Sequence, residues 1–322
     1  MMDLSIVIVN WNTKGYLVRC LRSIFEAGKK DSREVFVIDN GSGDGSADEV
    51  KRTFSTVRLI ENEENLGFAR AVNQGLRLSP GRYHLLLNPD TQIKEGSIET
   101  LLFFMDSHPE AGIAGVQLLN ADESKQNSIA NSPTLATELL NKSLLRWLFP
   151  GRYPGKEEVY REPIKVESVI GACMMVRKKA IEEVGLLDED YFLFLEETDW
   201  CYRMRKAGWE VYHVPTAEVY HFQGKSAEAN IGMAKIEYYR SRYQFFRKHY
   251  GQLPSTFLFG GLIAKLSVEF LSLFFGCLFT LFLIQKWRIK LSIYSQLLWW
   301  HLRLCPEEDG LRPTKEKQER IE

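Results

Sequence analysis

The chain has 322 residues, 45% of them hydrophobic, and a formal net charge of -1 at pH 7. This size allows one large α/β core or two smaller ones, and the balanced charge argues against general nucleic-acid binding. The five cysteines are odd in number and form no CxxC pair, so neither a disulfide framework nor a zinc site is indicated.

The N-terminus carries a short apolar run, Leu4 to Val9, without a preceding basic segment. Such a run suits a buried strand better than a signal peptide. Together with the cysteine pattern, this predicts a folded part that stays in the cytosol with reduced thiols.

The first 120 residues are expected to alternate strand and helix. Strands are predicted at 4–9, 35–39, 57–60 and 83–87, and helices at 14–26, 47–53 and 67–78. This alternation is typical of a parallel sheet flanked by helices, in which ligands bind at the carboxyl ends of the strands. Polar residues follow the strands at those ends, namely Asn10, Asn12, Asp39, Asn40 and Asp90.

The segment Asp39 to Ser46 is rich in glycine and joins a strand to a helix. It lacks the Gly-Lys-Ser/Thr of a P-loop and is not GxGxxG. A carboxylate at this strand end can accept the imide N–H of uracil or thymine, which makes Asp39 a candidate for reading a pyrimidine base. The alternative is a flexible turn whose Ser46 caps the next helix.

A helix is expected to start near Gly67, with Asn65 as its cap and Arg70 in its first turn. Amides at a helix start, with an arginine beside them, can face the anionic part of a ligand. A plain amphipathic helix explains the same segment.

Asn88 and Asp90 follow an apolar strand and emerge abruptly at the edge of the sheet. Mg²⁺ or Mn²⁺ typically uses one or two carboxylates together with phosphate oxygens and water, so Asp90 can serve such an ion. The alternative is an aspartate in a β-turn after Pro89.

The run Glu196 to Asp199 places three carboxylates at an expected helix start. The helix dipole alone can favour acids there, and an ionised carboxylate can also take a proton from a hydroxyl. Asp199 and Arg203 are four residues apart, so an ion pair gives Asp199 a structural alternative. The aromatic run from Tyr191 to Leu195 suits either a sugar-contacting surface or the core.

Two further segments, 209–214 and 218–222, are expected to be strands, and His221 stands at the exit of the second. A lone histidine in such a position is more often a core residue than a ligand, although the loop after it leaves room to reach a metal. His213 is interpreted as structural.

The C-terminal third is apolar from 257 to 284, with only Lys265 and Glu269 charged. Because 270–284 is shorter than the about 20 residues of a spanning helix, we expect a hairpin in the membrane face or one imperfect span. Trp299 and Trp300 would add an interfacial anchor. The alternative is a buried helical pair, such as a dimer interface.

An ordered set of motifs resembles family 2 glycosyltransferases with the GT-A fold, of the bacterial rhamnosyltransferase type. The resemblance covers about Leu4 to Ser226 and is carried by Ser5 to Asn12, Val37 to Ser42, Asn65 to Ala69, Leu87 to Asp90, Gly171 to Met174, Gly185 to Glu189, Glu196 to Asp199, and His221 to Ser226. Each motif is weak by itself, whereas the ordered set is specific.

The resemblance implies a role for each matching residue. Nucleotide-sugar binding would involve Asn10, Asn12, Asp39, Gly67, Arg70, Asn88 and Asp90. Mg²⁺ or Mn²⁺ would be held by Asp90 and His221. The acceptor would meet Gly171, Ala172, Asp188 and Glu196. Glu197 would be the catalytic base, although the family usually has Asp there, and Asp199 is the second choice.

The expected protein is an α/β enzyme of the GT-A type, with a Rossmann-like, mostly parallel sheet and a C-terminal helical, membrane-associating extension. The expected domains are 1–250, with a nucleotide-sugar half (1–120) and an acceptor half (121–250), then 251–305 as the apolar helical region and 306–322 as a charged, disordered tail.

The expected function is inverting, metal-dependent transfer from a dTDP- or UDP-sugar, first of all rhamnose, to a glycan or polyprenyl-linked acceptor in cell-surface polysaccharide synthesis. The enzyme would work at the cytoplasmic side of the membrane, with a homo-oligomer as an open option. One alternative is a non-catalytic scaffold that binds nucleotides or glycans. A sugar nucleotidyltransferase would need a basic Gly-rich triphosphate loop, which the sequence does not show.

Overall fold

The computed structural model describes residues 3–26, 33–149, 160–222 and 231–312. The chain divides into two compact units. The sheet unit comprises 1–132, 154–192 and 196–226, and the helical unit comprises 133–153, 193–195 and 227–322. The domain limits expected from the sequence, with a boundary at residue 250, stay a prediction.

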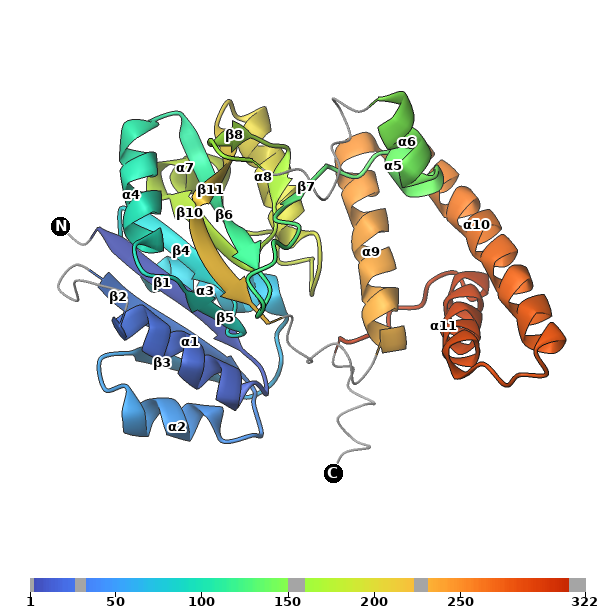
Figure 1. The fold of residues 1–322 in the computed structure, drawn as a ribbon, viewed down its shortest axis with the longest axis horizontal. Helices are drawn as coiled ribbons and strands as arrows, with labels where there is room; N and C mark the ends of the chain where they lie inside the picture. Colours follow the sequence, from blue (N-terminus) through green and yellow to red (C-terminus); the bar gives the residue numbers. More distant parts are fainter. Residues whose placement is uncertain (1–2, 27–32, 150–159, 223–230, 313–322) are drawn as a thin grey trace. The chain divides into compact units, whose positions relative to one another are not determined.

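The sheet unit is built on a mixed, mostly parallel sheet (Figure 1). Its strands are β1 (Leu4–Asn10), β2 (Arg33–Asn40), β3 (Arg58–Asn62), β4 (Tyr83–Leu87), β5 (Thr91–Ile93), β6 (Ala111–Leu119), β8 (Ile164–Lys165), β10 (Cys173–Arg177) and β11 (Glu210–His221). The order is β3-β2-β1-β4-β10-β6-β11-β5, with β8 beside β11. The first four strands are parallel neighbours, and β10 is antiparallel to both β4 and β6. A small separate sheet pairs β7 (Ile129–Ala130) with β9 (Ser168–Val169).

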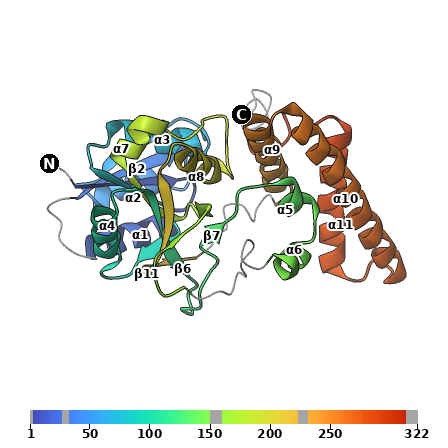
Figure 2. The ribbon, with the colours of Figure 1, turned by 90° about the horizontal axis from the view of Figure 1, so that it is seen from above.

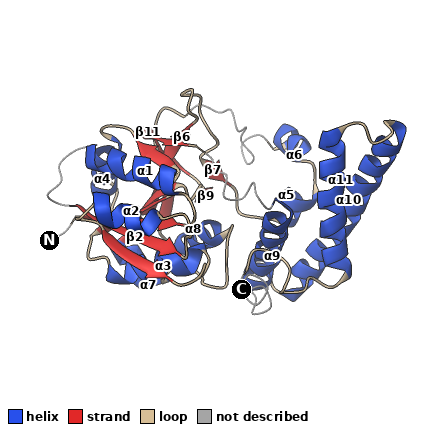
Figure 3. Cartoon of the chain, turned by 90° about the horizontal axis from the view of Figure 1, so that it is seen from below, coloured by secondary structure: helices blue, strands red, loops and turns tan. Residues whose placement is uncertain are grey.

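Helices cover both faces of this sheet, as Figures 2 and 3 show. One face packs against α1 (Lys14–Glu26), α2 (Ser46–Thr53) and α4 (Ser97–Ser107), and the other against α3 (Phe68–Leu78), α7 (Lys178–Val184) and α8 (Glu196–Lys206). Side chains of a strand alternate between faces, so Ile6 and Ile8 join the first core and Val7 and Val9 the second. Burial on both faces explains why the parallel strands are continuous apolar runs.

The elements predicted for the first 90 residues are all present, within one or two residues at their ends. Two predicted caps are wrong. The N-cap of α2 is Gly45, and Ser46 is the first residue of the helix. The Ser46 N–H donates to Asp44 Oδ1 at 3.0 Å. Gly67 is the N-cap of α3, and Asn65 accepts a hydrogen bond from its N–H at 3.0 Å. The two strands predicted at 209–214 and 218–222 are one strand, β11, with an irregularity between Val214 and Glu218.

The helical unit contains α5 (Leu135–Leu139), α6 (Lys142–Leu148), α9 (Ile231–Tyr250), α10 (Gln252–Phe279) and α11 (Gln285–Leu302). In the parts of the chain that the structure describes, α10 is the one helix long and apolar enough to cross a membrane by length and composition. Helix α10 runs unbroken to Phe279, through both of the charged positions Lys265 and Glu269. The helical hairpin therefore consists of α10 and α11, and the turn is 280–284.

The start of the expected disordered tail is held in place. The guanidinium of Arg240 on α9 donates to the carbonyls of Pro306 and Asp309 at 3.1 and 2.6 Å. Arg312 approaches Glu237 at 3.1 Å. Residues 306–312 are thus part of the helical unit, and 313–322 lie outside the described residues.

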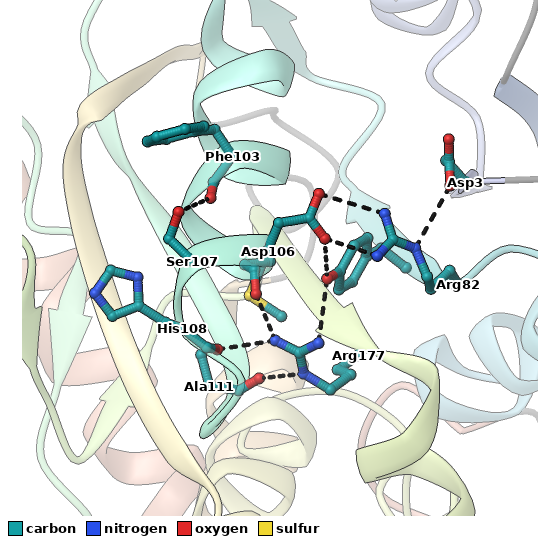
Figure 4. A network of polar contacts seen from close by, with 10 residues as sticks. Asp3, Arg82, Phe103, Asp106, Ser107, His108, Ala111 and Arg177 are labelled. Carbon is teal, nitrogen blue, oxygen red and sulfur yellow. Dashed lines mark hydrogen bonds and ion pairs between the residues drawn. The ribbon is translucent and has the colours of Figure 1, made fainter.

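The amino end of β4 is closed by a polar network (Figure 4). Arg177 donates to the carbonyls of Met105, His108 and Ala111 at 2.7, 2.9 and 2.8 Å, and to the Tyr83 hydroxyl at 3.1 Å. That hydroxyl donates to Asp106 at 2.8 Å, and Arg82 completes the pairing of Asp106. Donors and acceptors match throughout, as expected of a structural network.

Candidate active site

Two loops meet at the carboxyl ends of β1 and β2. Asp39 is buried and accepts hydrogen bonds from Asn10 Nδ2 and the Ser42 N–H, both at 2.9 Å. Asn12, which has a positive φ of 52°, is exposed and accepts from the Gly43 N–H at 2.8 Å. The predicted residues Asn10, Asn12 and Asp39 thus lie together, and Ser42 is a partner that the sequence analysis did not single out.

Asn40 organises the start of α3. Its side chain donates to Asn65 Oδ1 at 2.8 Å and accepts from the Leu66 N–H at 3.1 Å. Gly67, with φ 86°, would place a Cβ 2.7 Å from the Phe192 ring, so only glycine fits. The Phe68 N–H donates to the Phe192 carbonyl at 2.7 Å. The start of α3 is therefore joined to the segment that leads into α8.

Arg70 is directed toward a surface acid. Its Nε lies 3.9 Å from Glu189 Oε2, and Arg77 binds the other oxygen of the same carboxylate at 2.6 Å. A hydrogen bond from Asn73 and these arginines lower the pKa of Glu189. Asp188 is half-buried, and its side chain accepts from the Asp190 N–H at 3.0 Å. The structure places Arg70 with Glu189 rather than with the acids at the end of β4.

Asp90 and His221 face each other at the ends of β4 and β11. The reason is register: β5 pairs antiparallel with β11, with Thr91 opposite His221, so the turn before β5 brings Asp90 alongside. Asp90 Oδ2 lies 3.6 Å from His221 Nε2, and both side chains are largely buried. The Phe222 N–H donates to the Asp90 carbonyl at 2.9 Å.

Gln126 orients the imidazole of His221. Its amide nitrogen donates to Asn120 Oδ1 and to the His221 carbonyl at 2.7 and 2.6 Å, which turns its oxygen toward His221 Nδ1 at 3.0 Å. Burial lowers the pKa of His221, although Asp90 opposes the shift, so the ring is neutral at pH 7 with its proton on Nδ1. The Nε2 lone pair then points at a carboxylate oxygen.

Two acceptor atoms at this distance fit a shared divalent cation. A neutral imidazole whose other nitrogen donates to an amide oxygen is the usual form of a metal-bound histidine. Among residues 3–26, 33–149, 160–222 and 231–312, no group of three or more His, Cys, Asp or Glu side chains forms a ligand set. The protein therefore offers two ligands here, which suits an ion that keeps substrate oxygens and water in its other positions.

Glu197 lies in the first turn of α8 and packs on Gly171. A Cβ at Gly171 would stand 3.3 Å from Glu197 Cγ, so the absence of a side chain makes room for the acid. The next residue, Ala172, accepts a hydrogen bond from the Asn88 N–H at 2.9 Å. Through these two contacts, Asn88, Gly171, Ala172 and Glu197 lie at the same edge of the sheet, two residues from Asp90.

The environment of Glu197 shifts its protonation. Burial raises the pKa of its carboxyl, and hydrogen bonds from its own N–H and from Thr198 act in the opposite direction. A base with a raised pKa is a stronger proton acceptor once it is ionised. The carboxyl, once ionised, is therefore suited to take a proton from a bound hydroxyl.

Asp199 and Glu196 are differently placed. Asp199 is fully buried, and its Oδ2 accepts from Arg203 Nε at 2.7 Å; the same guanidinium also donates to the carbonyl of Leu186 at 2.8 Å. This contact fastens α8 to the loop after α7 and leaves Asp199 inaccessible to an acceptor. Glu196 is buried beside it, only 6% exposed.

Besides Ser42, two contributors to this geometry could not be recognised in the sequence. Gln126 lies in a polar loop between β6 and β7, where nothing in the local pattern distinguishes it from a surface residue. Phe192 was grouped with the general aromatic run, and its carbonyl contact to α3 depends on tertiary packing. The end of the matched His221 motif, Gln223 to Ser226, lies outside the described residues.

Comparisons with known proteins agree on one family. The model of "Glycosyl transferase family 2" matches residues 5–185. The N-acetylglucosaminyl-diphospho-decaprenol L-rhamnosyltransferase of Mycobacterium tuberculosis is 30% identical over 258 residues, 75% of this chain and 83% of the relative. The dTDP-rhamnosyl transferase RfbF of Shigella flexneri is 26% identical over 261 residues, 77% of this chain and 80% of the relative.

A solved structure shows the same architecture. The mannosyltransferase PcManGT from Pyrobaculum calidifontis, in complex with GDP-Man and Mn²⁺, has a TM-score of 0.54 at 13% identity, covering 95% of this chain and 88% of that one. At this identity the likeness concerns the fold. The predicted α/β class with a mostly parallel sheet is confirmed.

Proposed function

Because the chain belongs to glycosyl transferase family 2 and is a glycosyltransferase with the GT-A fold, we propose that it transfers a sugar from a nucleoside-diphosphate donor to a hydroxyl, with inversion. The observation that supports this most is the shared sheet edge. The Asn88 to Ala172 hydrogen bond and the Gly171 to Glu197 contact join the predicted donor-side and acceptor-side residues.

The donor is proposed to be a dTDP- or UDP-sugar. Asp39 is held by Asn10 and Ser42, and each of its oxygens keeps a second acceptor direction for the imide N–H of a pyrimidine. Gly67 and the start of α3 would face the diphosphate. Rhamnose is the first choice of sugar, because two relatives are named rhamnosyl transferases, one of them dTDP-dependent by name.

Mg²⁺ or Mn²⁺ is proposed to bind at Asp90 and His221. When bound, the ion would offset the charge that develops on the departing diphosphate. Asp90 supplies a hard oxygen ligand, and Gln126 keeps the Nε2 lone pair of His221 directed at the site. Asn88 is proposed to contact the donor beside them.

Glu197 is proposed as the base. The acceptor oxygen attacks the anomeric carbon, its proton passes to a Glu197 carboxylate oxygen, and the bond from that carbon to the phosphate oxygen breaks with its electron pair. The nucleoside diphosphate leaves, and no covalent sugar intermediate forms. Asp199 has a buried structural partner in Arg203, so it supports α8 instead.

The acceptor is proposed to be a glycan or a polyprenyl-linked sugar used for cell-surface polysaccharide. Gly171, Ala172, Asp188 and Glu196 are assigned to the acceptor side because they lie beside Glu197 or in the loop before it. A relative is named for a decaprenol-linked substrate, which supports a lipid-linked acceptor. The proposed place of work is the cytoplasmic side of the membrane.

A thermal-shift panel of nucleoside diphosphates, with and without Mn²⁺, tests donor class and metal need together. Stabilisation by dTDP or UDP that requires the metal is expected, because the diphosphate would complete the coordination. GDP is the matched control, since it carries the same diphosphate and a purine. No change in melting temperature with any nucleotide would favour a non-catalytic scaffold. Stabilisation that does not require the metal would remove the cation from the proposal.

A further inference from the structure

One face of α10 exposes uncharged side chains along its whole length. They recur every three or four residues: Leu253, Phe257, Gly260, Ala264, Val268, Leu271, Phe275 and Leu278. This spacing keeps them on one side of a helix. The opposite side packs inside the helical unit through Leu258, Leu262 and Leu266. We call the exposed set the outer stripe.

The two charges of α10 are used within the helical unit. Lys265 Nζ donates to the Glu138 carbonyl at the end of α5, at 3.1 Å. Glu269 is hydrogen-bonded by Tyr294 of α11 and lies near Lys235 of α9. Neither charge therefore requires water on the outer stripe.

The partner of α10 decides whether the helix can cross a bilayer. With 28 residues α10 is about 42 Å long, which exceeds the hydrocarbon core. However, α11 packs antiparallel along it: Gly276 contacts Trp287 at one end, and the Phe259 and His301 rings are 5.7 Å apart at the other. A crossing α10 would carry α11 into the hydrocarbon.

The first turns of α11 are basic. Lys286, Arg288 and Lys290 are exposed and follow directly after the turn that ends α10. Cations at the centre of a bilayer are expensive, whereas beside anionic headgroups they are favourable. The turn itself is apolar, with Phe279 92%, Leu281 79% and Leu283 81% exposed. Apolar side chains next to cations match the boundary between acyl chains and headgroups.

We propose that the α10–α11 hairpin lies on an anionic bilayer without crossing it. The outer stripe and the turn enter the acyl-chain boundary, and Lys286, Arg288 and Lys290 contact lipid phosphates. Trp299, exposed at the far end of α11, adds an interfacial anchor. This bilayer contact rests on the proposed function in one respect: a lipid-linked acceptor would explain why the enzyme works at a membrane.

Co-sedimentation of the full chain with vesicles tests the proposal. Binding is expected to phosphatidylcholine vesicles that contain phosphatidylglycerol, and to be much weaker to phosphatidylcholine alone. Lys286→Glu/Arg288→Glu/Lys290→Glu should weaken partitioning by at least about 100-fold. The matched control is Lys51→Glu/Arg52→Glu/Lys179→Glu, which reverses three exposed cations of the sheet unit and should bind as the original protein does.

Two outcomes would overturn the proposal. Protein that stays with native membranes after alkaline carbonate extraction would indicate a spanning helix. Concentration-dependent dimerisation without any binding to vesicles would indicate that the outer stripe packs against a second copy of the chain. Nucleotide-dependent thermal shifts of the triple variant should stay normal, so a failure here is distinguishable from a failure of the proposed function.

Discussion

The two ends of β4 carry polar clusters that are built in opposite ways. At the amino end, the guanidinium of Arg177 is matched by three carbonyls and the Tyr83 hydroxyl, and Asp106 is matched by Arg82 and Tyr83 (Figure 4). At the carboxyl end, a neutral imidazole turns its lone pair toward Asp90, and burial raises the pKa of Glu197.

This difference separates a structural network from a site. A matched network gains from burial, because each donor has an acceptor in a medium of low dielectric constant. At the other end, Asp90 and His221 can share a cation and Glu197 can take up a proton, so these side chains are suited to binding and reaction. Mutations at the two ends should therefore affect different measurements, and the four below are ordered by the size of the kinetic change that we expect, whether in kcat or in the metal requirement.

Glu197→Gln should have the largest effect. Loss of the base is expected to lower kcat by about 10²- to 10⁴-fold while dTDP or UDP still binds. The raised pKa in the folded state means that ionising Glu197 lowers stability as pH rises above its unfolded-state pKa, so the amide should not reduce the melting temperature at neutral pH. Kinetics and thermal melting on the same samples check both statements.

The pH profile sharpens this prediction. Turnover requires the ionised carboxylate, so the acid limb of kcat/KM should lie at higher pH than an ordinary glutamate would give. Normal turnover in Glu197→Gln would remove it as the base.

Gln126→Leu should have the next largest effect. Without the amide oxygen, His221 loses the partner that fixes its tautomer, and the Mn²⁺ concentration for half-maximal activity should rise about 10- to 100-fold. Turnover at saturating metal should be largely retained. An unchanged metal requirement would show that His221 does not act through this nitrogen.

Gly171→Ala should have a smaller effect. The added Cβ would stand 3.3 Å from Glu197 Cγ, so the acid must shift by a few tenths of an ångström. We expect kcat to fall by about tenfold with little change in stability. Gly43→Ala is the control, since a Cβ there meets nothing within 4 Å; equal kcat in both variants would contradict the prediction.

Arg177→Met should leave turnover unchanged and lower stability. The change removes the guanidinium that donates to the carbonyls of Met105, His108 and Ala111. Loss of these hydrogen bonds should lower the free energy of unfolding by about 1–3 kcal/mol. Denaturant unfolding measures this loss, and kcat of the folded fraction provides the contrast with Glu197→Gln. A large loss of kcat with intact stability would break the distinction between the two ends of β4.

Local patterns determined much of this protein. The strands and helices of the first 90 residues follow from apolar periodicity, because the spacing of apolar residues along the sequence reflects which faces of an element are buried. The polar residues after each strand are likewise local, and parallel topology then places them at one edge. The ion pair of Asp199 with Arg203 follows from helical spacing alone.

Only the tertiary structure decided how distant segments meet. Thr91 pairs with His221 across 130 positions, Glu197 finds space at Gly171, and Gln126 turns the imidazole of His221. The pairing of α10 with α11 was also beyond the sequence, since it depends on which surfaces pack together. Periodicity specifies which face of an element is buried, whereas register and packing against remote elements specify its neighbour.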